Sequence, residues 1–250
     1  MPVFIDGIGL SKIRFSYRNY KEIQNAHRTW SSKRLKIGLS YLTGAAALGI
    51  GLKFFIKRAF NNPSVLITAV RCLITTIFVF SFFEVLPQYP LGVSEVHFIF
   101  GATLFLFFGV GATAFGLVVG LSLQGLLLAP SDLPQLYINI STLLFPLYAV
   151  SYISKKIIPA DIAYTDLKYT HVISLTGIYQ GGIILWVAFW CFYGQGFNQE
   201  TFYNVGVFSL AYSTVIGIEC LLDVGLLATL KSYKTSLPSV FNNRLISVKD

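Results

Sequence analysis

The sequence predicts an all-α polytopic membrane protein with six to seven transmembrane helices, including a short helical hairpin broken by glycine. Of its 250 residues, 54% are hydrophobic and only 12% are charged, and the mean hydropathy is +0.66. Soluble domains carry roughly a quarter charged residues. No Asp, Glu, Lys or Arg occurs between His97 and Asp132. This composition excludes a soluble globular domain.

Five apolar stretches are each long enough to cross about 30 Å of hydrocarbon at about 1.5 Å per residue. They comprise residues 37–56, 64–83, 137–153, 172–193 and 203–230. A sixth stretch, residues 96–129, is long for one span and short for two, so its length does not decide the number of crossings.

The distribution of basic residues indicates that the sixth stretch crosses twice. The loops at 84–95, 130–136 and 194–202 contain no Lys or Arg, whereas the other connections are basic. Positive charge stays on the inner side of a membrane, and only a double crossing puts all three bare loops outside. Gly109 and Gly111 are the natural reversal point, and Gly116 and Gly120 favour close helix packing in the second arm.

The predicted organisation is a basic amino-terminal arm (1–36), a transmembrane domain (37–230) and a basic cytoplasmic tail (231–250). The arm holds 8 of the 19 Lys and Arg residues. Seven crossings with the tail inside leave the arm outside, against the positive-inside rule. Either the arm forms an interfacial amphipathic helix, or the true count is six. Basic flanks of this kind meet anionic lipid, so the expected partner is the bilayer and not nucleic acid.

Charged residues lie deep inside two of the predicted spans. Arg71 belongs to the second span, and Glu219 and Asp223 lie four residues apart on one face of the last span. Charges at membrane depth are costly and are usually paired or functional. We predict an intramembrane charge pair between Arg71 and one of the carboxylates. It either locks two helices together or forms a coupling contact near the inner surface.

Polar side chains also gather at the outer mouths of the predicted spans. Imidazole and carboxylate suit borderline divalent metals, so His97, Glu95 and Glu84 are candidate metal ligands. Glu95 and His97 are two residues apart and not the three or four that a helical chelate prefers, a spacing more typical of a helix cap beside an interfacial histidine. The other members are Gln124, Asp132, Gln135 and Asn139, which could converge on one outward-facing pocket.

The sequence contains none of the local motifs that indicate an enzyme. It has no G-x-x-x-x-G-K-[ST] phosphate loop, nucleophile elbow, H-E-x-x-H helix or C-x-x-C pair. We therefore expect no catalytic residues and no covalently bound cofactor.

An ordered set of central motifs resembles the cobalt/nickel substrate-specific permeases of energy-coupling-factor transporters. This family shows a P-T/V-G segment, a glycine-broken hairpin, an L-x-Q-A/G-L run, a loop, and an Asn a few residues before a Pro. The corresponding segments here are Pro90 to Ser94, the hairpin beginning Gly101-Ala102, Gly120 to Leu126, Ala129 to Asp132, and Asn139 with Pro146. A looser match at residues 35–52 extends the similarity to about two thirds of the chain.

The resemblance implies a substrate-binding subunit in a bacterial-type inner membrane that hydrolyses nothing itself. Cytoplasmic ATPase subunits and a transmembrane coupling subunit would be its partners, and cobalt or nickel its transported substrate. Two departures affect the metal site. Family members begin Met-His and carry His before the Pro of the P-x-G segment, whereas this chain has Pro2 and Tyr89. Pro2 has no amide hydrogen to lose, and tyrosine is a poor nickel ligand at neutral pH.

Tyr89 joins Gln124, Asp132 and Asn139 as a candidate substrate-pocket residue. Three functions remain open: metal uptake through an altered site, a permease for an organic substrate, and a non-transport membrane subunit that keeps the fold. The lost histidines and the aromatic richness favour an organic ligand, and the basic arm favours a non-transport role.

Overall fold

The computed structural model describes residues 35–57, 65–86, 89–91, 93–232, 240–241 and 245. The chain divides into two compact units, Met1–Leu39 and Ser40–Asp250. Apart from Leu35 and Lys36, the predicted basic arm and its interfacial helix lie outside the described residues. Most of the predicted tail at 231–250 lies outside them too.

Six helices of the described chain are long and apolar enough to cross a membrane. They are Leu35–Lys57, α2 (Val65–Glu84), α3 (Gly101–Leu127), α4 (Leu136–Ile157), α5 (Tyr169–Gln195) and α6 (Gln199–Ser232). Two short 3₁₀ helices, η1 (Pro130–Gln135) and η2 (Tyr164–Asp166), flank α4, and β1 (Tyr89–Leu91) pairs antiparallel with β2 (Ser94–Val96). The predicted all-α polytopic fold is therefore confirmed.

The helices place apolar residues outward and several polar ones inward. In α2, Leu66 and Leu73 are more than half exposed. Its buried residues include Thr68, Arg71, Thr75 and Thr76. A lipid solvent favours this pattern, because apolar side chains lose nothing by facing hydrocarbon while polar groups need partners inside the protein.

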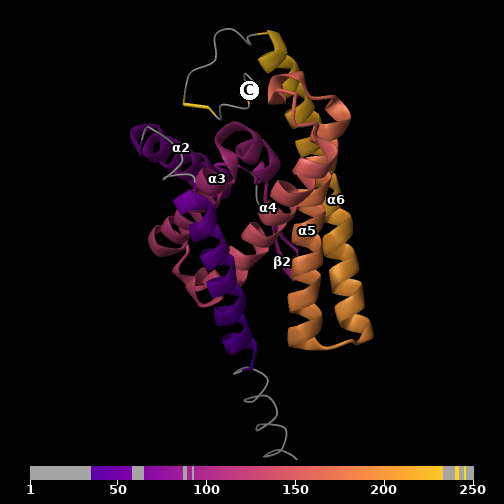
Figure 1. Ribbon diagram of the computed structural model, residues 1–250. Helices are drawn as coiled ribbons and strands as arrows, with labels where there is room; N and C mark the ends of the chain where they lie inside the picture. The colour runs from indigo at the N-terminus through magenta and orange to yellow at the C-terminus, as the bar shows by residue number, and fades with distance from the viewer. Residues whose placement is uncertain are drawn as a thin grey trace, which may run out of the picture. The chain divides into compact units, whose positions relative to one another are not determined.

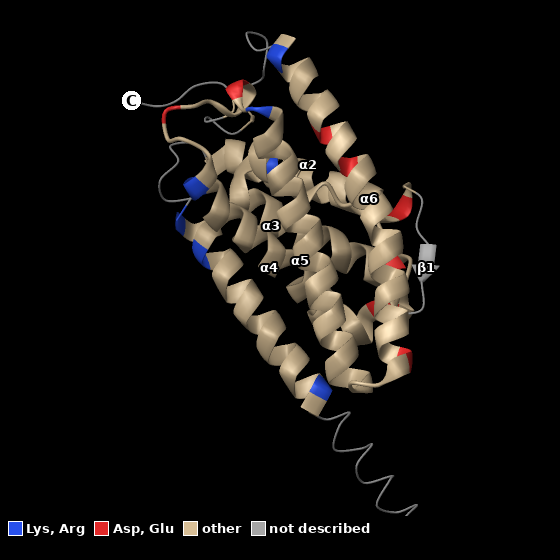
Figure 2. Cartoon of the chain, turned by 90° about the vertical axis from the view of Figure 1, so that its right-hand side faces the viewer, with Lys and Arg blue, Asp and Glu red and all other residues tan. Residues whose placement is uncertain are grey.

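Neighbouring helices pack in sequence order. The helix α3 packs on α2 and α4, and α5 packs on α4 and α6. Figure 1 shows α5 and α6 side by side as a long antiparallel pair. Within the unit Ser40–Asp250, Lys and Arg gather at the end where α4 and α6 terminate (Figure 2). This is the charge asymmetry that the loops of the sequence predict.

The helix α3 reverses direction at Gly109, as the sequence predicts. Gly109 has φ 81° and ψ 164°, a backbone conformation open only to glycine. Along α2, Phe82 contacts Phe100 (ring centroids 5.1 Å apart) and Phe78 contacts Phe108 (6.4 Å). The first arm therefore runs antiparallel to α2.

The second arm of α3 returns in the direction of α2. The Thr75 hydroxyl donates to the Ala112 carbonyl (2.9 Å). Farther along both helices, a Cβ added at Gly120 would lie 2.8 Å from a Val79 methyl group. The hairpin divides α3, one of the six long helices, into two arms. Its first arm, Gly101 to Phe108, is about 12 Å long. It is therefore too short to span about 30 Å of hydrocarbon by itself, unlike the two full crossings predicted for residues 96–129.

The glycines of the second arm allow close contact with α2, as predicted. A Cβ at Gly116 would lie 2.5 Å from the Thr75 Cβ and 2.7 Å from the Thr75 backbone carbon. No side chain fits at that distance. The backbones of α2 and α3 can approach this closely only because Gly116 has no side chain.

Gly116→Ala should therefore destabilise the protein by about 1–3 kcal/mol, because α2 must shift to admit the methyl group. Thermal unfolding in detergent measures the effect. Gly217→Ala is the matched control, since no atom lies within 4 Å of a Cβ there, and it should be neutral or slightly stabilising. Equal behaviour of the two variants would contradict the close packing of α2 and α3.

Candidate substrate cavity

A cavity of about 320 Å³ lies where β2, the second arm of α3, η1 and α4 meet α5 and α6. It occupies the end of the bundle opposite the basic ends of α4 and α6. Its polar lining residues include Ser94, Glu95, His97, Gln124, Asp132, Gln135, Asn139 and Thr142. Its apolar lining includes Phe83, Leu121, Leu143, Ile183, Val187, Phe208 and Tyr212.

The cavity unites most of the polar residues singled out in the sequence. Glu95 and His97 come from β2 and the segment after it, Gln124 from α3, Asp132 from η1 and Asn139 from α4. Gln124 is only 8% exposed. Among the described lining residues there is no Lys or Arg, so the cavity favours a cation or a hydrogen-bond donor.

Two candidate residues do not join this group. Glu84 ends α2 and does not line the cavity. Tyr89 lies on β1 opposite Val96, and its side chain is outside the described part of the structure. Sequence reasoning missed the apolar floor of the cavity, because its residues look like ordinary residues of a membrane span. The floor comprises Phe83, Leu121, Ile183, Val187 and Phe208.

His97 and Glu95 form a side-chain pair at the cavity wall. The His97 Nε2 lies 3.1 Å from a Glu95 carboxylate oxygen, and the exposed fractions of the two side chains are 14% and 51%. The His97 ring also packs on Phe83 (centroids 4.9 Å apart). Burial lowers the pKa of His97, while Glu95 acts in the opposite direction. The pair thus suits a neutral imidazole that donates from Nε2 to the carboxylate.

The predicted three-residue metal site is not assembled. Among the described residues, no group of three His, Cys, Asp or Glu side chains converges to hold a metal ion. Glu95 and His97 interact with each other, and Glu84 stands apart from the cavity. The prediction of Glu84, Glu95 and His97 as joint metal ligands is wrong in this respect, because β2 turns Glu95 and His97 toward the cavity while Glu84 remains at the end of α2.

The carboxylate of Glu219 holds the entry to the α3 hairpin. It accepts hydrogen bonds from the backbone amides of Ile99 (2.6 Å) and Phe100 (3.2 Å) and from the side-chain amide of Gln180. Phe100 has φ 54° and no side-chain cap of its own. Glu219 supplies the missing cap from α6, and a carboxylate is favoured at a helix amino terminus.

Asp223 continues this contact one turn farther along α6. It accepts hydrogen bonds from the hydroxyls of Thr103 in α3 and Thr176 in α5, the latter at 2.6 Å. Asp223 is 3% exposed. The two carboxylates together tie the first arm of the hairpin to α5 and α6.

The predicted ion pair between Arg71 and these carboxylates is therefore wrong. Both Glu219 and Asp223 are satisfied by neutral donors. The Arg71 guanidinium instead donates to the backbone carbonyls of Val240 and Phe241, beyond the end of α6. Arg71 is 1% exposed. Its planar group matches two adjacent carbonyls, so it fixes the carboxyl-terminal segment against α2.

Phe241, the second of these two carbonyl residues, packs against the hairpin turn. The Phe241 ring lies 5.6 Å from the rings of both Phe107 and Phe108, which directly precede Gly109. Leu245 is 1% exposed and belongs to the same core. Val240, Phe241 and Leu245 therefore connect the chain beyond α6 to α2 and to the hairpin turn.

A chain of hydrogen bonds links the cavity wall to the hairpin contact. The Tyr212 hydroxyl donates to Gln180 Oε1 (3.0 Å), and Gln180 in turn donates to Glu219. Tyr212 and Ile99 both line the cavity. The backbone amide of Ile99 donates a hydrogen bond to Glu219. The side chains of Tyr212, Gln180 and Glu219 therefore form a continuous hydrogen-bonded link between the cavity wall and the start of the first arm.

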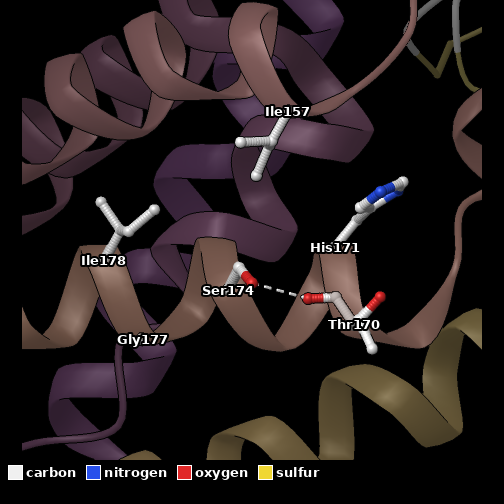
Figure 3. Close-up of a pocket in the computed structure, with 6 residues that line it drawn as sticks. All are labelled: Ile157, Thr170, His171, Ser174, Gly177 and Ile178. Carbon is white, nitrogen blue, oxygen red and sulfur yellow. Dashed lines mark hydrogen bonds between the residues drawn. The ribbon is translucent and has the colours of Figure 1, made fainter.

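A second hollow is an open groove of about 760 Å³ near the start of α5. Figure 3 shows Ile157 above a row of α5 residues that includes His171, Thr170 and Ser174. The Ser174 hydroxyl donates to the Thr170 carbonyl within the same helix (2.8 Å). The groove is larger than the cavity, but there is no carboxylate or amide side chain among its described lining residues. The cavity, with its converging polar groups, is the candidate site.

Comparison with known families gives a match over most of the chain. The family model described as the cobalt uptake substrate-specific transmembrane region matches residues 36–237. Neither the curated proteins nor the solved structures gave a match. The matched region contains α2 to α6 and all but the first residue of the helix Leu35–Lys57, and it ends before Val240 and Phe241.

Removal of a donor to Asp223 should loosen the hairpin. Thr176→Val should cost about 1–3 kcal/mol of stability, because a buried carboxylate oxygen loses its partner. Thr229→Val is the control, since that exposed hydroxyl donates, among the described residues, only to the Gly225 carbonyl of its own helix. It should change stability by less than about 0.5 kcal/mol. Thermal unfolding in detergent compares them, and equal losses would argue against the tie between α3 and α5.

The carboxyl-terminal segment should contribute to stability through its buried leucine. Leu245→Ala should cost about 2–5 kcal/mol, the range for a buried leucine. Leu221→Ala, at a side chain that is 75% exposed on α6, should cost far less. The same unfolding measurement applies, and an undisturbed Leu245→Ala protein would show that the segment does not dock.

Proposed function

Because the chain belongs to the family of cobalt uptake substrate-specific transmembrane regions, we propose that it is the substrate-binding membrane subunit of an energy-coupling-factor transporter. Its family is a transporter membrane component and not an enzyme. The proposed substrate is a divalent transition metal, cobalt or nickel. In this arrangement ATP is hydrolysed by cytoplasmic partner subunits.

The acidic, acceptor-lined cavity is the observation that carries this proposal. Glu95 and Asp132 provide two carboxylates, and Gln124, Gln135 and Asn139 provide amide oxygens. These oxygen acceptors attract a cation, and apolar walls behind them strengthen the attraction by excluding water. Without a nearby Lys or Arg in the described lining, their charge is available to a ligand.

The orientation of the cavity fits uptake. The three loops at the cavity end of the bundle contain no Lys or Arg, while the opposite end is basic. By the positive-inside rule the cavity faces outward. A substrate captured there would then have to pass the hairpin, whose position is fixed by Glu219 and Asp223.

The proposed partners act at the basic end. A cytoplasmic ATPase and a transmembrane coupling subunit would move the bundle from that side, where Arg71 holds the segment at Val240 and Phe241. The sequence itself has no phosphate-binding loop of the G-x-x-x-x-G-K-[ST] type. Energy for transport would therefore have to come from another chain.

An organic substrate is the second candidate, and one observation favours it. The cavity floor is formed by apolar and aromatic side chains, including Phe83, Ile183, Val187 and Phe208. Pockets of about 300 Å³ and more with apolar walls and a few polar groups are typical of small organic ligands. The family match favours cobalt, so the metal remains the first candidate.

Loss of the two cavity carboxylates should reduce cobalt uptake. In cells that produce this chain with its transport partners, the double variant Glu95→Gln/Asp132→Asn should lower radioactive cobalt uptake about tenfold or more, because two charged acceptors are lost. Glu200→Gln is the control, since Glu200 is exposed at the start of α6 and does not line the cavity. Unchanged uptake by the double variant would contradict the assignment of this cavity.

A further inference from the structure

We infer that the cavity takes its metal as a cationic complex that keeps its own ligands, and that the protein hydrogen-bonds to this ligand shell and does not coordinate the metal ion. The inference rests on the proposed function and names the form in which the substrate is bound. It follows from the size of the cavity, the distribution of its polar groups and its apolar floor.

The cavity is too large for a bare ion, and its described side chains do not supply enough converging metal ligands. A bound transition metal holds its ligand atoms at about 2.0–2.3 Å, so those atoms must crowd around one point. Among the described residues, no three His, Cys, Asp or Glu side chains do so. The volume of about 320 Å³ has room for about ten water molecules. A metal ion with six ligand groups fits that space, and a bare ion leaves most of it empty.

His97, the one imidazole among the described lining residues, is engaged with a neighbour. His97 Nε2 lies 3.1 Å from the Glu95 carboxylate, which fixes the proton on that nitrogen. The other ring nitrogen, Nδ1, is buried. Neither nitrogen therefore presents a lone pair to the open cavity. His97 positions Glu95 for contact with a ligand from outside.

The remaining polar groups suit the recognition of donors. Glu95, Asp132, Gln124, Gln135 and Asn139 can all accept hydrogen bonds, and they come from four different elements around the cavity. The N–H or O–H groups of a metal-bound shell carry part of the ion's positive charge, so they are strong donors to carboxylates. A shell of six such groups could reach several of these acceptors at once.

The apolar floor favours a shell that contains carbon. Leu121, Ile183, Val187 and Phe208 offer no hydrogen-bond partner. Water ligands facing this floor would leave their O–H groups without hydrogen-bond partners, which is unfavourable. Methylene groups on the same side would instead gain from burial. An organic amine chelate of the metal offers N–H donors to the polar acceptors and methylene groups to the apolar floor.

Substitution-inert cobalt(III) complexes test the inference directly, because their ligands exchange too slowly to be replaced by protein groups. The probes are tris(ethylenediamine)cobalt(III), which carries N–H donors and methylene groups, hexaamminecobalt(III), which carries donors only, and aqueous cobalt(II). Binding to the full chain in lipid nanodiscs is measured by isothermal titration calorimetry. We expect the ethylenediamine complex to bind with one site per chain and to bind more tightly than the other two probes.

Variants connect this binding to the cavity. Glu95→Gln and Asp132→Asn should each weaken binding of the ethylenediamine complex about tenfold, the loss expected for one charge-assisted hydrogen bond. Glu200→Gln should leave it unchanged. The two mirror-image forms of the complex should bind unequally, since a folded cavity is chiral whereas general attraction to acidic surface is not selective.

The outcomes separate this inference from the proposed function. Binding of aqueous cobalt(II) alone, with imidazole nitrogen in its X-ray absorption spectrum, overturns the intact-shell inference and leaves metal uptake standing. Binding of tetraethylammonium with no binding of any cobalt species overturns both, in favour of an organic cation. Binding of the inert complexes that Glu95→Gln and Asp132→Asn do not weaken also overturns the inference.

Discussion

The contact between Glu219 and the amino-terminal end of α3 is the interaction on which the rest of the bundle depends. The segment before α3 is not helical, and its backbone amides lie among packed helices. In a membrane such amides have no water to bind. Glu219 accepts from two of them, at Ile99 and Phe100, and thereby allows a short arm to enter the bundle from one end. Asp223 secures the same arm one turn farther on.

This arrangement connects the lining of the substrate cavity directly to the hairpin. Ile99 and Tyr212 both line the cavity, and both connect to Glu219, the latter through Gln180. At the other end of the first arm, Phe107 and Phe108 rest on Phe241, which Arg71 holds in place. The first arm is therefore fixed at its cavity end by α6 and at its turn by the carboxyl-terminal segment. A displacement of Glu219 or of Phe241 would therefore shift the first arm and, through it, the contacts at its other end.

The sequence predicts the spans and the reversal at Gly109 because both depend on local properties, namely apolar length, charge sidedness and the freedom of glycine. It also identifies most of the polar residues of the cavity, since they stand out at the mouths of apolar spans. It does not predict that Glu219 accepts from the backbone amides of Ile99 and Phe100, which lie about 120 positions away in the chain. Charge alone suggested Arg71 as that partner. The apolar floor escapes prediction because a residue such as Phe208 looks the same whether it faces lipid or a cavity.

The central claim is that this chain captures a transition metal for a transporter driven by other subunits. Elemental analysis by mass spectrometry of the gently purified native assembly, with its protein subunits identified in the same sample, tests it most directly. The account predicts cobalt or nickel in stoichiometric amount together with an ATPase subunit. An assembly that contains neither metal nor ATPase would contradict the account and would mean that the fold serves a role other than transport.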